Sequence, residues 1–292
     1  MLSILFVGFL VLAAVGGQTA KPVTQKINTA SILPVYIGPE LSAQAYLVKI
    51  VGEDKVLLTQ RAWKKLPPAS LTKIMTSLVA LRELNPFNRI TFSRDSKNTE
   101  QIVSPTKAGE SFTREDMVRL AIVGSANDAA LALAEETGRS KGAQSFGESL
   151  MIFKDLMNQE AARLGMADTS FENPVGFDDP THYTTAQDLA RLAEYTWFNY
   201  PLIWEFSRSQ EADVYSEVGN AYKMANSNNL LKEFPSILGT KTGTTDNAKE
   251  ALVMFYPVRP DKTALVIILK SENRAEDGRK ILQWLDGLDL NK

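Results

Sequence analysis

Short apolar runs separated by turn residues occupy both ends of the chain. Near the N-terminus, runs over 43–51 and 55–60 flank Gly52-Glu53-Asp54, an arrangement typical of a β-hairpin. Near the C-terminus, runs rich in apolar and β-branched residues predict strands over 237–245, 251–256 and 262–270.

Helical spacing of apolar residues dominates the middle of the chain, between about 69 and 200. Thr113 and Thr185 are each followed three residues later by an aspartate, which predicts N-terminal helix caps. Gly124 and Gly138 stand where helix C-termini are expected.

A final helix is expected over 274–286, and Gly287 follows it where helices commonly end. Its inward face would be formed by Ile281, Leu282, Trp284 and Leu285. Strands at both ends with helices between them cannot all be joined by βαβ crossovers. The economical solution is an α+β fold: one antiparallel sheet covered by the last helix, a mostly helical middle, and a cleft between the two.

The first 20 residues contain no charged side chain and consist of an apolar stretch followed by small residues. This pattern favours a secretory signal peptide, and an uncleaved N-terminal membrane anchor is the alternative because the stretch is nearly long enough to span a bilayer. Residues 21–40 contain Pro22, Pro34 and Pro39 and are predicted to form a linker. The main domain is therefore expected over 41–292, on the outer side of the cytoplasmic membrane.

The amino-acid composition excludes several classes of function. Apolar residues make up 44% and charged residues 23%, as in globular proteins, and a net charge of −2 without a basic tract argues against nucleic acid as a partner. Cysteine is absent and His182 is the single histidine, so thiolate sites, cysteine nucleophiles and histidine-rich zinc sites are excluded. G-x-S-x-G is absent too, so a hydrolase of this sequence would use lysine or a carboxylate as its base.

The segment 67–73, Pro-Pro-Ala-Ser-Leu-Thr-Lys, opens the first predicted helix because proline is tolerated only at a helix start. Ser70 and Lys73 would share one helix face, close enough for the lysine amine to take the serine proton. Ser104 and Lys107 have the same spacing, but Gly109 follows and no helical pattern continues. Taken alone, a capping serine beside a solvated lysine explains Ser70 and Lys73 equally well.

Two further motifs would border the cleft. Ser125 and Asn127 lie at the turn between two predicted helices, where a simple helix cap is the alternative interpretation. Lys241-Thr242-Gly243, followed by Thr244, lies on a predicted strand and offers a positive charge, a hydroxyl and room for a substrate backbone. A polar edge strand protected by lysine is the alternative there.

Together, S-x-x-K, S-x-N and K-T-G in this order form the motif set of penicillin-recognising serine acyltransferases. The sequence around these motifs resembles one family in particular, the D-alanyl-D-alanine carboxypeptidases among the low-molecular-mass penicillin-binding proteins. The resemblance covers about residues 40–290, with the strongest matches over 67–76, 125–130, 171–176, 182–190 and 239–243.

The resemblance implies a serine peptidase that needs no cofactor and no metal, acts on peptidoglycan stem peptides ending in D-Ala-D-Ala, and is inhibited covalently by β-lactams. It implies a five-stranded antiparallel sheet covered by helices plus a mostly helical subdomain. Ser70 would be the nucleophile, Lys73 its base, and the N–H groups of Ser70 and Thr244 the oxyanion hole. The implied catalytic residues are Ser70, Lys73, Ser125, Asn127 and Lys241, and the implied substrate-binding residues are Thr242, Gly243 and Thr244.

Departures from the family pattern leave alternatives open. The sequence ends at Lys292, where many relatives continue into a second β-rich domain, so an endopeptidase acting on peptidoglycan cross-links is an alternative. A class A-like β-lactamase and a non-catalytic wall-binding protein are two others, although no Glu-x-x-Leu-Asn motif follows Asn127. Residues 245–250 lack the usual Ala-Gly pair.

Several polar residues are left without a firm role. Lys270 and Arg274 are both candidates for the basic residue that meets the substrate carboxylate. His182 is expected to be structural, and Asp178 and Asp179 are expected to form a turn before Pro180.

Overall fold

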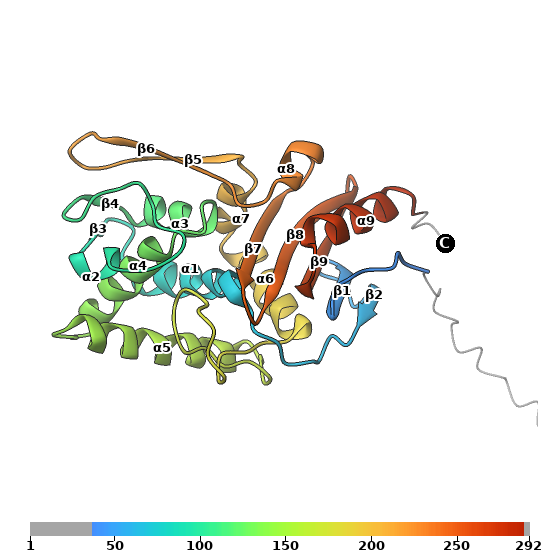
Figure 1. Cartoon of the computed structure of the whole chain (residues 1–292), viewed down its shortest axis with the longest axis horizontal. Coiled ribbons are helices and arrows are strands. Elements are labelled where there is room, and N and C mark those ends of the chain that lie inside the picture. The colour runs from blue at the N-terminus through green and yellow to red at the C-terminus, as the bar shows by residue number, and fades with distance from the viewer. Residues whose placement is uncertain (1–36, 289–292) are drawn as a thin grey trace, which may run out of the picture. The chain divides into compact units, whose positions relative to one another are not determined.

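A five-stranded antiparallel sheet organises the computed structural model, which describes residues 37–288 (Figure 1). Its order is β2-β1-β9-β8-β7, so strands from both ends of the chain are neighbours. The strands are β1 (Ala45–Ile50), β2 (Val56–Gln60), β7 (Gly239–Thr245), β8 (Lys249–Arg259) and β9 (Lys262–Ser271). The predicted α+β fold with a single sheet built from both termini is confirmed.

Helices fill the sequence between β2 and β7 and follow β9. They are α1 (Thr72–Glu83), preceded by the 3₁₀ turn η1 (Ala69–Leu71), α2 (Arg94–Lys97), α3 (Arg114–Ile122), α4 (Asn127–Ser140), α5 (Phe146–Arg163), α6 (Ala186–Asn199), α7 (Leu202–Ser207), α8 (Leu230–Glu233) and α9 (Arg274–Asp286). Both threonine caps are confirmed, since Thr113 accepts from the Asp116 N–H and Thr185 from the Asp188 N–H.

Gly138 does not end a helix as predicted, because α4 continues through it to Ser140. A Cβ at Gly138 would lie 2.3 Å from the Ser149 Cα, so the glycine allows α4 and α5 to approach closely. The sequence does not predict two small antiparallel sheets: β3 (Arg89–Thr91) with β4 (Ser111–Thr113), and β5 (Glu211–Tyr215) with β6 (Ala221–Ala225). The first has strands of three residues, too short to show a two-residue period.

Each face of the sheet has its own core. On one face, Leu252 and Ile268 pack with Ile281, Leu282 and Leu285 of α9, while Trp284 is only half-buried. On the other face, a larger core joins the sheet to α1, α3, α4 and α6. Burial of apolar surface on both faces fixes the sheet between the two helical layers.

The first helix connects the sheet to the helical part of the molecule. Its turn η1 packs against β7, and α1 continues among α3, α4, α5 and α6 with every residue from Thr72 to Ala80 buried (Figure 1). The stretch between Lys73 and Arg82, which contains no charged residue, is therefore central. The start of this helix lies at the boundary between sheet and helices.

Part of the predicted organisation falls elsewhere. The predicted signal segment over 1–20 and most of the linker over 21–40 lie outside the described residues. Among residues 37–288, no helix has both the length and the apolar character needed to cross a membrane.

Candidate active site

The start of the first helix brings a serine and a lysine into direct contact. Ser70 lies in η1 and Lys73 in the first turn of α1, and the Lys73 Nζ donates a hydrogen bond to the Ser70 Oγ at 2.8 Å. Ser70 is half-buried, whereas Lys73 is completely buried. The lysine is therefore shielded from water, whereas part of Ser70 stays accessible to it.

Lys73 is surrounded by neutral acceptors. Besides Ser70, its Nζ donates to the Asn127 Oδ1 and to the Val175 carbonyl oxygen, both at 2.8 Å. Burial lowers the pKa of Lys73 from 10.5 to about 7, although the charge of Asp128 opposes this shift. A substantial fraction of Lys73 is thus neutral near pH 7, which is the form that can accept a proton.

Two glycines fix the peptide that precedes Ser70. A Cβ on Gly243 of β7 would lie 2.9 Å from the Ser70 nitrogen, and one on Gly176 would lie 1.9 Å from the Ala69 carbonyl oxygen. Ala69 itself has the left-handed backbone angle φ of 48°. Ser70 therefore sits on a strained turn held between β7 and the 172–180 loop.

A second serine and lysine meet across the fold. The Lys241 Nζ donates to the Ser125 Oγ and to the Thr242 carbonyl oxygen, both at 2.8 Å, and the lysine is completely buried. Burial first, and then the charges of Lys73 and Arg274, lower the pKa of Lys241 well below its usual value. Ser125 has a left-handed φ of 60°, so the turn between α3 and α4 is bent to present its hydroxyl.

Asn127 is oriented from both ends of its amide. Its Oδ1 accepts from Lys73, and its Nδ2 donates to the Glu100 carbonyl oxygen at 2.9 Å. The next residue, Asp128, is buried and pairs with Lys97 at 2.6 Å while accepting from the Ser104 N–H. These contacts tie the 98–107 loop to the start of α4.

The end of β7 carries the remaining predicted residues. The Thr242 and Ser227 hydroxyls are 2.6 Å apart. Arg274, at the start of α9, donates to the Thr244 Oγ1 at 2.5 Å and to the Gly243 carbonyl oxygen at 3.2 Å, and it lies 3.5 Å from Glu250. Of the two basic candidates, Arg274 therefore lies at this site, whereas Lys270 lines a separate pocket beside Lys65 and Pro67.

The 172–180 loop contains features that the sequence did not assign to the site. Val175 offers only its carbonyl oxygen, and Gly176 only the space where a side chain is missing, so neither carries a side-chain signal. Asp178 accepts from the Thr245 hydroxyl at 2.6 Å and from the Asn247 N–H at 3.0 Å, so it joins this loop to the β7–β8 turn rather than only forming a local turn. Asp179 does form the expected turn, accepting from the Thr181 N–H.

His182 has a structural environment, as expected. It is buried, its Nδ1 accepts from the Glu172 N–H at 3.3 Å, and its Nε2 therefore donates to the Thr72 hydroxyl at 2.9 Å. Burial lowers the pKa of His182 to about 4, so it stays neutral at physiological pH. Within residues 37–288, no group of three or more acidic or histidine side chains is arranged to hold a metal ion.

Comparisons with known proteins identify the family. A model of the D-alanyl-D-alanine carboxypeptidase family matches residues 34–273. The chain is 29% identical to D-alanyl-D-alanine carboxypeptidase DacF of Bacillus subtilis and 30% identical to DacC of Escherichia coli, over 85% of this chain in each case. These matches span 62% of each relative's length, so the chain covers less than two thirds of either protein.

Two other matches extend the comparison. The chain is 29% identical to a D-alanyl-D-alanine endopeptidase of Pseudomonas aeruginosa, over 85% of this chain and 78% of the relative. The crystal structure of the Streptomyces K15 DD-transpeptidase matches with a TM-score of 0.76 and 26% identity, over 86% of this chain and all of the other. The resemblance seen in the sequence is thus confirmed, and the chain belongs to the D-alanyl-D-alanine carboxypeptidase family.

Proposed function

We propose that the protein is a serine-type D-Ala-D-Ala carboxypeptidase that acts on peptidoglycan stem peptides through an acyl-enzyme on Ser70. The main support is the buried amine of Lys73, 2.8 Å from the Ser70 hydroxyl and with a pKa lowered to about 7. A serine that only caps a helix does not require a buried lysine beside it. A nucleophilic serine requires a base that takes its proton.

In the first step, the Ser70 Oγ attacks the carbonyl carbon between the two D-alanines while Lys73 takes its proton. The carbonyl oxygen becomes an oxyanion, which the N–H groups of Ser70 and Thr244 would stabilise. The close contact between Gly243 and the Ser70 nitrogen supports this role, because it keeps the two donors on adjacent segments.

In the second step, the C–N bond breaks and the leaving D-alanine nitrogen takes a proton from the Ser125 hydroxyl, which recovers a proton from Lys73, so that the proton of Ser70 is relayed to the leaving group. Lys241, 2.8 Å from that hydroxyl, would support the transfer electrostatically, and Asn127 would hold the substrate amide. Water then attacks the ester carbon and gives a proton to Lys73; the ester C–O bond breaks, the Ser70 oxygen takes this proton back, and the shortened peptide is released. No step requires a cofactor.

The terminal carboxylate of the substrate would meet Thr242, Thr244 and Arg274. Arg274 already contacts the Thr244 hydroxyl, and its guanidinium offers the planar pair of donors that suits a carboxylate. We therefore assign this binding role to Arg274 rather than to Lys270.

The deciding experiment uses the chain without residues 1–20. It should form a lasting adduct with benzylpenicillin, mapped by mass spectrometry to Ser70, and release D-alanine from a D-Ala-D-Ala peptide. Ser70→Ala should fold normally and do neither. A folded wild-type protein that forms no adduct and releases no D-alanine would support the non-catalytic wall-binding alternative.

Assays of the same purified protein distinguish two other activities. An endopeptidase is favoured by the match to the Pseudomonas aeruginosa relative of that name, and it would cleave a cross-linked peptide dimer faster than the linear peptide. A class A-like β-lactamase would turn over nitrocefin without a lasting adduct. Such an enzyme needs a glutamate that activates the deacylating water. The Glu172 carboxylate instead pairs with Lys154 at 3.5 Å, which favours a lasting adduct.

The proposed activity also defines where the protein works. Stem peptides lie outside the cytoplasmic membrane, so we propose that residues 1–20 direct export to the periplasm or cell surface, by cleavage or as a membrane anchor. Residues 41–292 would then form the catalytic domain. Comparing the mass of the exported protein with that of the full chain distinguishes the two fates of the N-terminal segment.

A further inference from the structure

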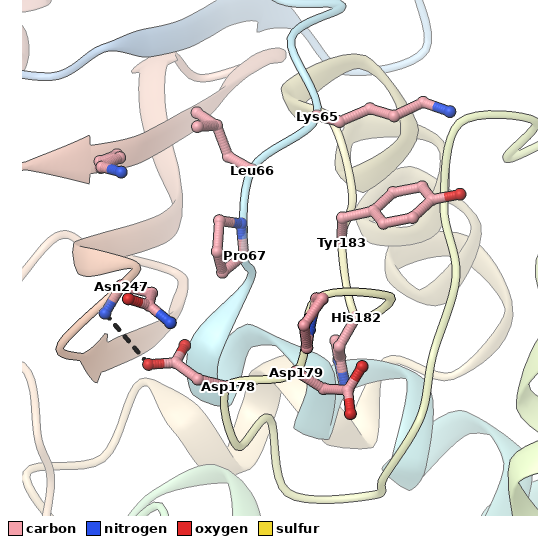
Figure 2. A pocket seen from close by; sticks show the side chains of 10 residues that line it. Lys65, Leu66, Pro67, Asp178, Asp179, His182, Tyr183 and Asn247 are labelled. Atoms are coloured by element: carbon pink, nitrogen blue, oxygen red, sulfur yellow. Dashed lines mark hydrogen bonds between the residues drawn. The ribbon is translucent and has the colours of Figure 1, made fainter.

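Asp178, in the wall of a pocket of about 390 Å³, connects two segments that are far apart in the sequence (Figure 2). Its Oδ1 accepts a hydrogen bond from the Thr245 hydroxyl at 2.6 Å, and its Oδ2 accepts one from the Asn247 N–H at 3.0 Å. Figure 2 shows the Asp178 side chain directed toward Asn247, whereas the side chain of Asp179 is directed away from it. Both oxygens of Asp178 thus link the 172–180 loop to the β7–β8 turn.

The part of the loop that precedes Asp178 is held in a fixed shape. The Asn173 Oδ1 accepts hydrogen bonds from three consecutive N–H groups, those of residues 175–177, at 3.2, 2.7 and 3.0 Å. The Thr76 hydroxyl of α1 donates to the Pro174 carbonyl oxygen at 2.6 Å. Asp178 therefore follows directly on a stretch that is stabilised both by its own turn and by the first helix.

The end of β7 is where Asp178 makes its contact. Of the described strands, β8 alone pairs with β7, at the margin of the sheet. Gly243 and Thr245 point to the same face of β7 because side chains alternate along a strand. On that face, Gly243 packs against the Ser70 nitrogen and the Thr245 hydroxyl donates to Asp178. The Thr244 peptide is therefore held on both sides, by one contact before it and one after it.

We propose that Asp178 is a positioning residue for the acylation of Ser70: its hold on Thr245 keeps the Thr244 N–H where the oxyanion forms. This inference rests on the proposed function, in which the N–H groups of Ser70 and Thr244 stabilise the oxyanion. Such donors act only when they lie within about 0.5 Å of the productive position. Asp178 does not touch the reacting atoms in this role and acts through the backbone of β7.

The size of the expected effect follows from the exposure of Asp178. This residue lies at the surface, where water competes for the partners of a hydrogen bond and weakens its contribution. Without Asp178, the Gly243 contact and the pairing with β8 remain, so the end of β7 shifts but does not unfold. We expect a loss of about three- to tenfold in rate, below the roughly 10²-fold that a displacement of about 1 Å can cost.

The test measures the rate of benzylpenicillin acylation by intact mass spectrometry. Asp178→Ala and Thr245→Val should each slow acylation by about three- to tenfold, and the double variant should be no slower than the slower single variant. Thr245→Ser keeps the hydroxyl and should acylate at the wild-type rate. With a D-Ala-D-Ala peptide, kcat should fall by the same factor while KM stays unchanged, because the oxyanion is present only near the transition state.

Two controls separate positioning from other causes. Asp246→Ala removes an equal charge from the same turn; Asp246 is exposed, and within residues 37–288 no hydrogen bond or ion pair involves its carboxylate. This variant should acylate at the wild-type rate. The final extent of acylation is the second control, since a positioning defect lowers the rate but still allows every molecule to react, whereas misfolding leaves a fraction unreacted.

Wild-type rates in both Asp178→Ala and Thr245→Val would overturn the proposal, and so would an equal loss in Asp246→Ala or incomplete acylation that accounts for the loss. Failure of the proposed function is recognised separately, because the wild type would then form no adduct and release no D-alanine. Amide hydrogen exchange of residues 243–248 needs no turnover and tests the contact in that case. Exchange should be faster in Asp178→Ala than in the wild type, and unchanged exchange would refute the hold on β7.

Discussion

The candidate active site contains two serine–lysine pairs with the same contact distance and different origins. Ser70 and Lys73 are three residues apart, and Ser125 and Lys241 are 116 apart, yet each lysine nitrogen lies 2.8 Å from its serine oxygen. The first pair arises within one helical turn, whereas the second requires β7 to pack against the α3–α4 turn. One pair is thus local in the sequence and the other depends on the whole fold.

The two lysines also differ in their remaining partners. Lys73 donates to Asn127 and Val175, which come from two other segments, while Lys241 donates to the carbonyl oxygen of the next residue on its own strand. Lys73, the proposed base, is therefore positioned by three segments. Even the local pair takes its environment from distant parts of the chain.

Replacing Lys73 should have the largest effect. Lys73→Met removes the base, so we expect benzylpenicillin acylation and D-alanine release to fall by about 10²- to 10⁴-fold. Lys73→Arg should lose as much, because arginine keeps the positive charge but does not give up its proton. The acylation rate is measured by intact mass spectrometry over time. An arginine variant with near wild-type rates would show that charge, and not proton transfer, is the contribution of Lys73.

This contrast explains what the sequence could predict. The helix start, the Ser70–Lys73 spacing and the five strands follow from prolines, helical spacing and apolar runs, which are local signals. The meeting of Ser125 with Lys241 could be expected only through the resemblance, because no local pattern relates residues 116 positions apart. The Val175 carbonyl and the β5–β6 hairpin were missed, since backbone acceptors carry no residue-type signal and alternation in short strands is weak.

Gly176→Ala should move Ser70 relative to Lys73, although Gly176 lies outside the helix start that carries both residues. The new Cβ would lie 1.9 Å from the Ala69 carbonyl oxygen, where ordinary contacts are 3.4–4 Å, and Gly176 has a φ of 93°. The Ser70 turn must then shift by more than 1 Å, which commonly costs about 10²-fold in rate. Gly165→Ala is the control, since Gly165 has a φ of 69° and nothing within 4 Å of a Cβ. Equal acylation rates in both variants would contradict the role of Gly176.

Replacing a member of the second pair should have a smaller effect. Ser125→Ala removes the hydroxyl beside Lys241, so we expect D-alanine release to fall by about 10- to 100-fold, the value of one hydrogen bond to a charged group. Lys241→Met should have a similar effect, and the double variant should be no slower than the slower single variant if the two act as one unit. Additive losses would mean that Ser125 and Lys241 act independently.

The smallest expected effect concerns stability, and it tests the ionisation of Lys73 without turnover. The unfolded chain keeps this lysine protonated up to about pH 10.5, whereas the folded chain keeps it so only up to about pH 7. Between these values the unfolded state binds more protons, so the contribution of Lys73 to the free energy of unfolding rises with pH. The wild type should therefore gain stability relative to Lys73→Met as pH increases from 7 to 9.

The gain is at most about 1.4 kcal/mol per pH unit, or roughly 2–5 °C in Tm. Differential scanning calorimetry of both proteins measures it. His182 does not contribute in this range, because its pKa is lowered to about 4. Acylation by the wild type should rise through the same pH range as Lys73 loses its proton. If the Tm difference between wild type and Lys73→Met stays constant while the acylation rate rises with pH, a group other than Lys73 titrates. Proton acceptance would then no longer be a property of Lys73.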